Sequence, residues 1–364
     1  MEVDCRALRA NYDAVTQRIP AGCRTLPMVK ADAYGIGATL AVRALAPLGP
    51  YGFGVATLEE ARGVRDDGWD GRIVVFTPTL PADVAGLVSA CCEPVVGNLS
   101  ALATCLEAGL QVHVEIDTGM GRFGFPWSTG PDGWPDRIAR MLSDAGGRGG
   151  GGIGSVFTHF HSAETDEAAT REQWRRFEAA VDALREVGVD PGLVHAANSA
   201  AAMEYPGVVA DVVRPGVWLY GVEVCGRRPQ PVAAVRARVL TVRDVDAGST
   251  VSYGATWTAS SPARLATIGI GYADGLPRCL SGKGRALIHG RPAPFRGVVT
   301  MDTTVVDVTG RDDVEPGDAA TVLGRDGAGE ITPEELAAAC GTIAYEILTG
   351  WSTRVPKIGL DGDA

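Results

Sequence analysis

The sequence predicts an α/β protein: a (β/α)8 barrel followed by a mostly β domain. In the first part of the chain, short apolar runs alternate with helical patterns in about eight β-then-α units. No G-x-G-x-x-G follows the first expected strand, which disfavours a doubly wound sheet, the alternative for such alternation. From about residue 230 the pattern becomes strand-rich with Gly and Asp turns. We expect a barrel domain over residues 1–225 and a mostly β domain over 226–364.

Each element of the barrel domain is predicted from its own pattern. Strands are apolar runs of a few residues bounded by turn residues, and they are expected over 25–30, 51–56, 72–76, 93–97, 111–117, 153–160, 193–198 and 212–221. Helices show the 3.6-residue period, in two cases with a closing glycine, and they are expected over 39–49, 58–68, 82–90, 99–109 and 166–188.

The second domain shows the alternation typical of β structure. Strands are expected within 232–245, 263–273, 284–309 and 319–325, with one helix over 333–341.

Composition and charge exclude several classes of function. The net charge of −11 would repel phosphate backbones, so nucleic acid is not expected as a partner. No apolar run of the roughly 18 residues needed to span a membrane occurs. The N-terminal sequence MEVDC is charged from its second residue, which predicts a mature, cytoplasmic protein.

Cysteines and histidines do not predict a disulfide framework or a metal site. The eight cysteines form no C-x-x-C pair, and the five histidines form no H-E-x-x-H. His159 and His161 would share one face of a strand, but no third ligand is suggested nearby, so no metal is expected.

Lys30 is the first candidate for chemistry. It closes an apolar run at the carboxyl end of the first expected strand, where barrel enzymes place their active sites. A lone lysine at such a position is most often a surface charge. Its sequence context therefore decides how it is interpreted.

That context resembles the alanine racemase family. The segment MVKADAYGIGA is similar to the family's pyridoxal phosphate lysine motif. Further segments resemble family blocks in the same order, and the resemblance covers nearly the whole chain: VEIDTGMGRFG, THFHSAETDE, HAANSAA, VVRPGVWLYG, VSYGATW, IGYADGLPR, TMDTTVVDVT and YEILTGWSTRVP.

The resemblance implies a set of cofactor-binding residues for pyridoxal 5′-phosphate (PLP). Lys30 would form the Schiff base, because burial lowers a lysine pKa enough to supply a neutral amine. Arg214 would contact the pyridine nitrogen, and since arginine keeps its proton it can donate a hydrogen bond but not protonate the ring, which disfavours transamination. The other implied cofactor contacts are Tyr34, His159, Asn198, Ser199, Gly216, Val217 and Tyr345.

The resemblance also implies two catalytic bases. Racemisation needs one base on each face of a planar carbanion, and Lys30 and Tyr253 fit this demand. A tyrosine is a poor base unless its pKa is lowered, for which His159 and Arg214 are candidates. In the family the tyrosine comes from the partner subunit, so a homodimer with shared active sites is expected.

The substrate is implied to be a small amino acid, most simply alanine. Arg122, Met301 and Asp302 resemble substrate contacts, and Tyr272 and Tyr345 resemble the residues that narrow access to the site. The sequence also departs from the family pattern, with Glu115 at the place of a carbamylated lysine, and with Ile36, Thr300 and the segment 349–351.

These departures leave other functions open. The substrate could be serine or a larger amino acid, in cell-wall supply or in a specialised pathway. Other PLP chemistry such as decarboxylation, or non-catalytic binding of PLP or cycloserine, is the further alternative.

Overall fold

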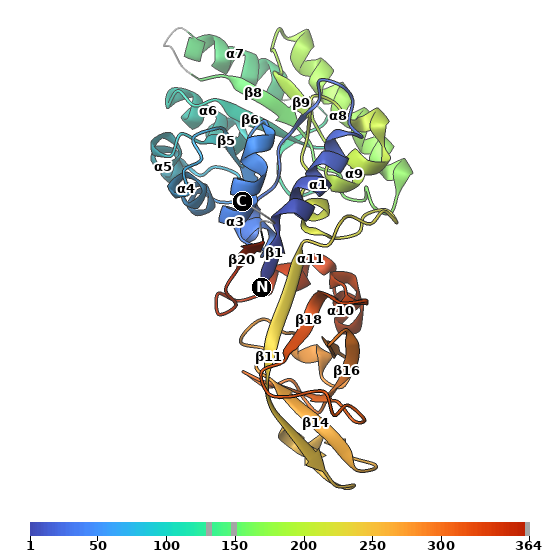
Figure 1. Ribbon diagram of the computed structural model, residues 1–364. Helices are drawn as coiled ribbons and strands as arrows, with labels where there is room; N and C mark the ends of the chain where they lie inside the picture. The colour runs from blue at the N-terminus through green and yellow to red at the C-terminus, as the bar shows by residue number, and fades with distance from the viewer. Residues whose placement is uncertain (129–132, 147–150, 361–364) are drawn as a thin grey trace.

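The computed structural model describes residues 1–128, 133–146 and 151–360 (Figure 1). The molecule is elongated, with a rounded α/β unit at one end and a narrower β unit at the other. No helix among the described residues is both long and apolar enough to cross a membrane.

Eight parallel strands form the barrel of the first unit. Hydrogen bonds close the ring, since the Leu26 amide donates to the Val213 carbonyl, and the Gly54 amide to the Pro27 carbonyl. The expected (β/α)8 barrel is thereby confirmed. Its strands are β2 (Arg24–Thr25), β3 (Phe53–Val55), β4 (Ile73–Val75), β5 (Glu93–Val96), β6 (Val112–Asp117), β8 (Ile153–Phe157), β9 (Leu193–His195) and β10 (Val212–Val213).

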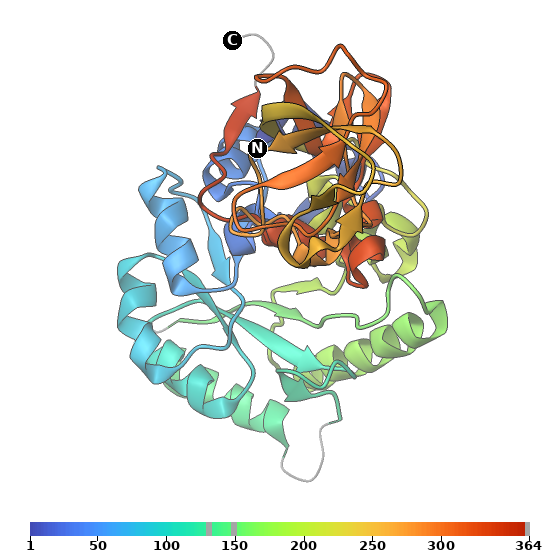
Figure 2. The ribbon, with the colours of Figure 1, turned by 90° about the horizontal axis from the view of Figure 1, so that it is seen from below.

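Helices cover the outside of this ring (Figure 2). The five predicted helices are confirmed as α3 (Ala38–Leu45), α4 (Leu58–Asp66), α5 (Val84–Ser89), α6 (Leu99–Glu107) and α8 (Glu167–Glu186). Helices that were not predicted include α1 (Cys5–Thr16), α7 (Trp134–Gly146) and the short α9 (Ser199–Glu204). The side chain of Asp4 caps α1 by accepting from the Arg6 and Ala7 amides.

The second unit is mostly β, as predicted, and is built on one large, mainly antiparallel sheet. Its strands include β11 (Ala233–Val245), β14 (Ala263–Ile268), β15 (Arg285–Ile288), β16 (Arg291–Arg296), β17 (Thr304–Asp307), β18 (Ala319–Asp326) and β19 (Gly329–Ile331). The predicted helix is α10 (Pro333–Cys340), and a second helix, α11 (Ala344–Thr349), was not expected. A disulfide joins Cys279 to Cys340, although the sequence pattern gave no reason to expect a disulfide.

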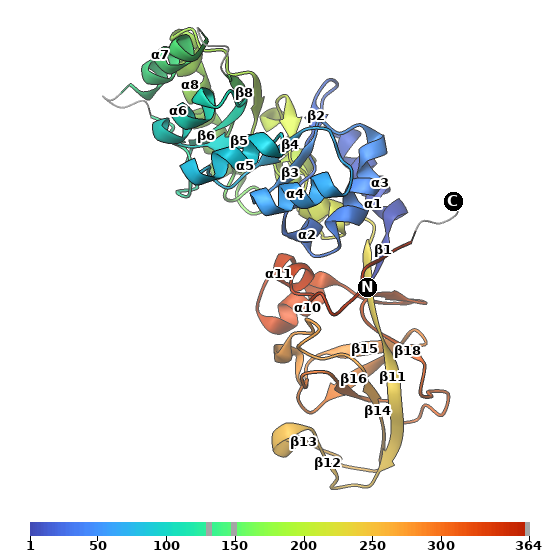
Figure 3. The ribbon, with the colours of Figure 1, turned by 90° about the vertical axis from the view of Figure 1, so that its left-hand side faces the viewer.

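Strands from the first and last parts of the described chain pair where the units join. The N-terminal β1 (Glu2–Asp4) pairs with β11 and with β20 (Ile358–Leu360), so both of these strands belong to the second sheet. From this junction β11 runs to a distal tip that carries β12 (Thr250–Val251) and β13 (Trp257–Thr258) (Figure 3). At the opposite end of the β unit, α11 lies against the mouth of the barrel.

Candidate active site

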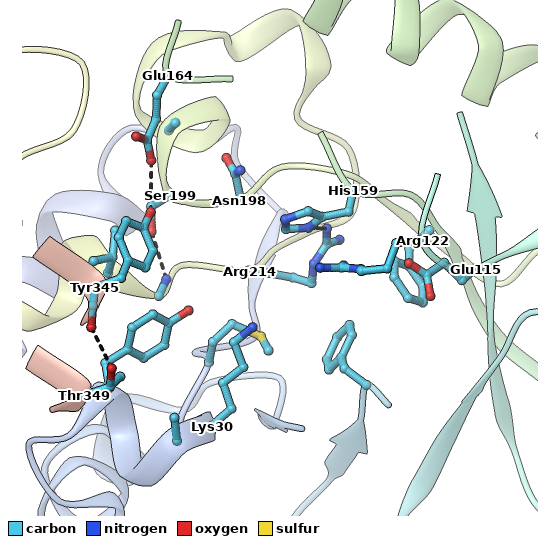
Figure 4. A pocket seen from close by; sticks show the side chains of 18 residues that line it. Lys30, Glu115, Arg122, His159, Glu164, Asn198, Ser199, Arg214, Tyr345 and Thr349 are labelled. Atoms are coloured by element: carbon cyan, nitrogen blue, oxygen red, sulfur yellow. Dashed lines mark hydrogen bonds between the residues drawn. The ribbon is translucent and has the colours of Figure 1, made fainter. Parts of the chain in front are cut away.

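A cavity of about 310 Å³ lies at the carboxyl ends of the barrel strands (Figure 4). It is lined by every cofactor residue that the sequence predicts and by two further candidates. These residues are Lys30, Tyr34, His159, Asn198, Ser199, Arg214, Gly216, Val217 and Tyr345, together with Glu115 and Arg122.

Lys30 begins a left-handed turn, α2 (Lys30–Tyr34), which follows the first barrel strand after the segment 26–29. Four consecutive residues, 31–34, have φ between 51° and 57°, although none is glycine. This conformation costs about 1–2 kcal/mol per residue. The carboxylate of Glu60 holds the turn, because it accepts from the amides of Ala31 and Ala56, both at 2.7 Å. Strain of this kind is typical of functional sites.

The environment of Lys30 favours a neutral amine. Burial lowers the pKa of its ammonium, the charges of Arg122 and Arg214 lower it further, and Glu60 partly opposes them. A lysine with a lowered pKa can act as a nucleophile and as a base.

Tyr345 reaches the cavity from α11, on the second unit. Its hydroxyl donates to Glu164 at 2.9 Å, and its ring lies 6.1 Å from that of Tyr34. Burial and the neighbouring Glu164 carboxylate raise the pKa of Tyr345. Gly35 permits the close approach of α11, since a Cβ at this position would collide with the Leu348 carbonyl. The β unit therefore closes one side of the site.

Hydroxyls and backbone amides gather at one end of the cavity. The Ser199 hydroxyl accepts from the Gly216 amide at 2.9 Å, and burial raises the pKa of Tyr34 to about 12, so that it stays a donor. A Cβ on Gly216 would collide with the Tyr34 hydroxyl, so any side chain there would force the Tyr34 ring to move. Asn198 caps α9 by accepting from the Ala201 amide. Donors arranged in this way suit a phosphate.

Arg214 lies at another side of the cavity, 4% exposed, and is held by four hydrogen bonds. It donates to the carbonyls of Thr158 and Ala196, to His195 Nδ1 at 2.6 Å and to His159 Nδ1 at 3.3 Å. Burial lowers the pKa of Arg214 to about 10, which leaves it charged at neutral pH. Its orientation is fixed by the protein alone.

His159 is neutral in this site. Burial, together with the charges of Arg214, Arg122 and Lys30, lowers its pKa to about 3. Because Arg214 can only donate, His159 Nδ1 is the acceptor, and the ring proton lies on Nε2.

Glu115 is buried beside Arg122, where the resemblance places a carbamylated lysine. Burial raises the pKa of the Glu115 carboxyl, and the charges of Arg122 and Arg214 lower it. The favourable charge interaction is thus present. A direct hydrogen bond between Glu115 and Arg122 stays a prediction.

Four predicted residues lie outside this cavity in their own chain. Tyr253, Tyr272, Met301 and Asp302 all belong to the β unit, and none is among the described residues that line the cavity. Tyr253 is 77% exposed and lies on η5 (Tyr253–Ala255) at the distal tip, and Asp302 pairs with Arg354. A single chain therefore does not bring Lys30 and Tyr253 together.

Sequence reasoning assigned no role to several residues that shape the site. Glu164 and His195 lie within segments that resemble the family, but only the structure shows their bonds to Tyr345 and Arg214. A buried arginine such as Arg214 needs hydrogen-bond acceptors, and this need is the signal that could have drawn attention to His195. No group of three or more His, Cys, Asp or Glu side chains in the described part of the chain is arranged to hold a metal ion.

Two models of one protein family match this chain. The family model for the alanine racemase N-terminal domain matches residues 3–224, and the model for the C-terminal domain matches residues 232–359. An alanine racemase of Halothermothrix orenii is 33% identical over 98% of this chain and 95% of its own, and one of Geobacter sulfurreducens is 37% identical over 99% and 96%.

Solved structures agree as well. The alanine racemase from D-cycloserine-producing Streptomyces lavendulae is 34% identical and superposes with a TM-score of 0.91, covering 99% of this chain and 96% of that one. The two family models together span nearly the whole chain, as do these relatives, and the chain belongs to the alanine racemase family.

Proposed function

We propose that this protein interconverts L-alanine and D-alanine with PLP as its cofactor. One observation carries the proposal: the half-buried Lys30, with its lowered pKa, faces a cavity that has phosphate donors at one end and the fixed Arg214 at another side. Full-length relatives named alanine racemase support the choice of substrate.

The cavity fits the chemical groups of PLP. Hydroxyls of Tyr34 and Ser199 and the backbone at Gly216 suit the phosphate dianion, and the missing side chain at Gly216 lets the backbone approach closely. Arg214 suits the pyridine nitrogen as a donor, and Lys30 suits the aldehyde. The cofactor when bound would supply an electron sink for the charge left on the substrate α-carbon.

Two side chains of one protomer would act on the substrate from one side. The neutral amine of Lys30 takes or returns the α-proton on one face. Arg122 binds the substrate carboxylate, and the nearby Glu115 carboxylate helps to hold the guanidinium in place.

The opposite face needs a second base, which we assign to Tyr253 of the partner subunit. The exposed position of Tyr253 at the distal tip leaves its hydroxyl available to another chain. His159 carries a proton on Nε2, with which it would donate a hydrogen bond to the hydroxyl oxygen of this tyrosine. The protein would then be a homodimer with two shared sites, related by a two-fold axis. Tyr272, Met301 and Asp302, from the same β unit, would complete each site.

This assignment gives each domain its own task. Residues 1–225 would form the PLP-binding unit, and residues 226–364 would supply the second base to the partner. A cytoplasmic location stays a prediction from the N-terminal sequence.

A screen of all proteinogenic amino acids, with chiral detection of product and loss of α-deuterium, tests the function. We expect alanine to racemise fastest, and Lys30→Ala to be inactive. Faster turnover of serine or a larger amino acid would show that alanine is not the main substrate, and release of an amine would indicate decarboxylation. Binding of PLP or cycloserine without α-proton exchange would contradict catalysis altogether.

A further inference from the structure

A line of buried polar side chains crosses the barrel interior and ends at Arg214. His195 lies 2.6 Å from Arg214 through Nδ1 and 2.9 Å from the Ser155 hydroxyl through Nε2. Ser155 lies 2.5 Å from His113 Nδ1, and His113 Nε2 lies 2.8 Å from Glu93 Oε2. We call Glu93, His113, Ser155 and His195 the interior network.

The network follows four adjacent strands. Glu93 begins β5, His113 lies on β6 in register with Ser155 on β8, and His195 ends β9. It thus runs diagonally from the amino end of the barrel, which faces away from the cavity, to the carboxyl end, where Arg214 lines it.

Burial makes the matching of donors and acceptors strict. His113, Ser155 and His195 are each at most 1% exposed, and the Phe157 ring stacks on His195 with centroids 5.1 Å apart. A buried polar atom that meets the wrong partner is costly where water is excluded.

The two ends of the network fix the direction of every hydrogen bond. Arg214 can only donate, so His195 Nδ1 accepts. Burial and the Arg214 charge hold the pKa of His195 well below its ordinary value, so the ring is neutral and its single proton lies on Nε2. That proton is donated to Ser155, whose hydroxyl must then donate to His113 Nδ1.

At the far end, Glu93 requires the same order. Burial opposes its ionisation, but the hydrogen bonds from His113 and Arg72, together with the Arg72 charge, outweigh burial and lower the pKa of the carboxyl. Arg72 Nε lies 2.7 and 2.8 Å from the two carboxylate oxygens. An ionised carboxylate only accepts, so His113 carries its proton on Nε2.

The reverse order would fail at Arg214. If His113 donated from Nδ1, the Ser155 hydroxyl would turn to donate to His195 Nε2. The proton of a neutral His195 would then lie on Nδ1 and face the N–H of Arg214, donor against donor. The carboxylate of Glu93, which accepts at one end, therefore requires that His195 Nδ1 accept from Arg214 at the other end of the network.

We propose that Glu93, His113 and Ser155 are positioning residues that act on Arg214 through the tautomer of His195. The consequence for catalysis rests on the proposed function, in which Arg214 donates to the cofactor. With the network intact, the guanidinium is offered one fixed acceptor and keeps one orientation. With the network disturbed, His195 offers a mixture of tautomers and Arg214 loses its fixed position.

The direct test is NMR of the full-length protein labelled with ¹⁵N-histidine, with and without added PLP. The sequence has only five histidines, so signals can be assigned by single substitutions. We expect His113 and His195 to be neutral with the proton on Nε2. A proton on Nδ1 of either ring, or on both nitrogens of His195, would overturn the proposal even if the protein racemises alanine. The correct tautomers in a protein without racemase activity would instead contradict only the proposed function.

Glu93→Gln and Ser155→Ala test the positioning role. Each should shift or split the His195 signals and lower kcat for racemisation about fivefold with little change in KM, the scale of one ordinary hydrogen bond. Thr25→Val is the matched control, because it removes a buried strand hydroxyl that bonds Tyr12 and lies outside the network. The control should leave kcat and the His195 signals unchanged.

A double-mutant cycle separates positioning from a general loss of stability. In a His195→Phe background, Glu93→Gln and Ser155→Ala should no longer lower kcat, because their effect passes through His195. An equal fall of kcat in both backgrounds would overturn the proposal, as would wild-type signals and kinetics in both single variants.

Discussion

The carboxylate of Glu60 is predicted to hold the strained turn that carries Lys30, and Glu60→Gln tests this. Glu60 accepts from the Ala31 amide through one oxygen and from the Ala56 amide through the other. Glutamine keeps one oxygen but presents an NH₂ group where the second acceptor was. One charge-assisted hydrogen bond is lost, and a donor then faces a donor.

The magnitude follows from these two bonds. A hydrogen bond to a charged group contributes about 1.5–3 kcal/mol, so the free energy of unfolding should fall by about that amount. The Glu60 charge also raises the pKa of Lys30, so its removal lowers that pKa further. The acidic limb of the pH–rate profile, where Lys30 becomes protonated, should therefore move to lower pH.

Urea unfolding at one fixed protein concentration and the pH dependence of kcat, which reports groups of the substrate complex, measure both effects. Glu59→Gln is the control, since Glu59 is the neighbouring residue on the same helix, 77% exposed, and lies 3.9 Å from Arg62. This control should change stability by less than about 0.5 kcal/mol. Equal stability of the two variants, with an unmoved acidic limb, would refute the role of Glu60.

The remaining predictions concern single side chains of the site. Lys30→Ala should lose both the yellow colour of bound PLP after dialysis and all α-proton exchange. The control Lys283→Ala, in an exposed turn, should keep both. Exchange of the α-proton by Lys30→Ala would contradict the role of Lys30. Glu115→Gln should weaken substrate binding by about 1–3 kcal/mol, because Arg122 is displaced. Since Glu115 needs no carbamylation, added bicarbonate should not raise the activity of the wild type. Unchanged kinetic constants in Glu115→Gln would leave Glu115 with a purely structural role. The pKa of His159 is lowered from 6.5 to about 3, so the unfolded state gains a proton first and stability falls as the pH drops from about 6.5 towards 3. His159→Gln should therefore flatten the fall of urea midpoint between pH 7.5 and 5, while the exposed His161→Gln should not.

The sequence was sufficient for those features that depend on local pattern. Strand and helix periodicity predicted the barrel and the β unit, because each strand or helix packs its apolar residues into a shared core and so leaves a periodic apolar run in the sequence. Lys30 and Arg214 were placed correctly, because both follow a barrel strand at its carboxyl end.

Features that depend on distant partners could not be predicted in the same way. The left-handed turn after Lys30 consists of ordinary residues and is held by Glu60, which lies 29 residues away from Ala31. Ser155 has no local signal, since its two histidine partners come from other strands. Strand β1 was missed because its partner β11 follows more than 200 residues later.

The most direct test of the shared active site is complementation between Lys30→Ala and Tyr253→Ala. The two inactive proteins carry different tags, are unfolded together and refolded, and the whole mixture is assayed; the heterodimer in it is then isolated by its two tags and quantified. If each site takes one base from each chain, a heterodimer holds one intact site and one doubly altered site. Random pairing makes about half of the dimers mixed, so the whole mixture should recover about a quarter of wild-type activity. A mixture that contains heterodimers but no activity would contradict the shared site and return Tyr253 to its own chain.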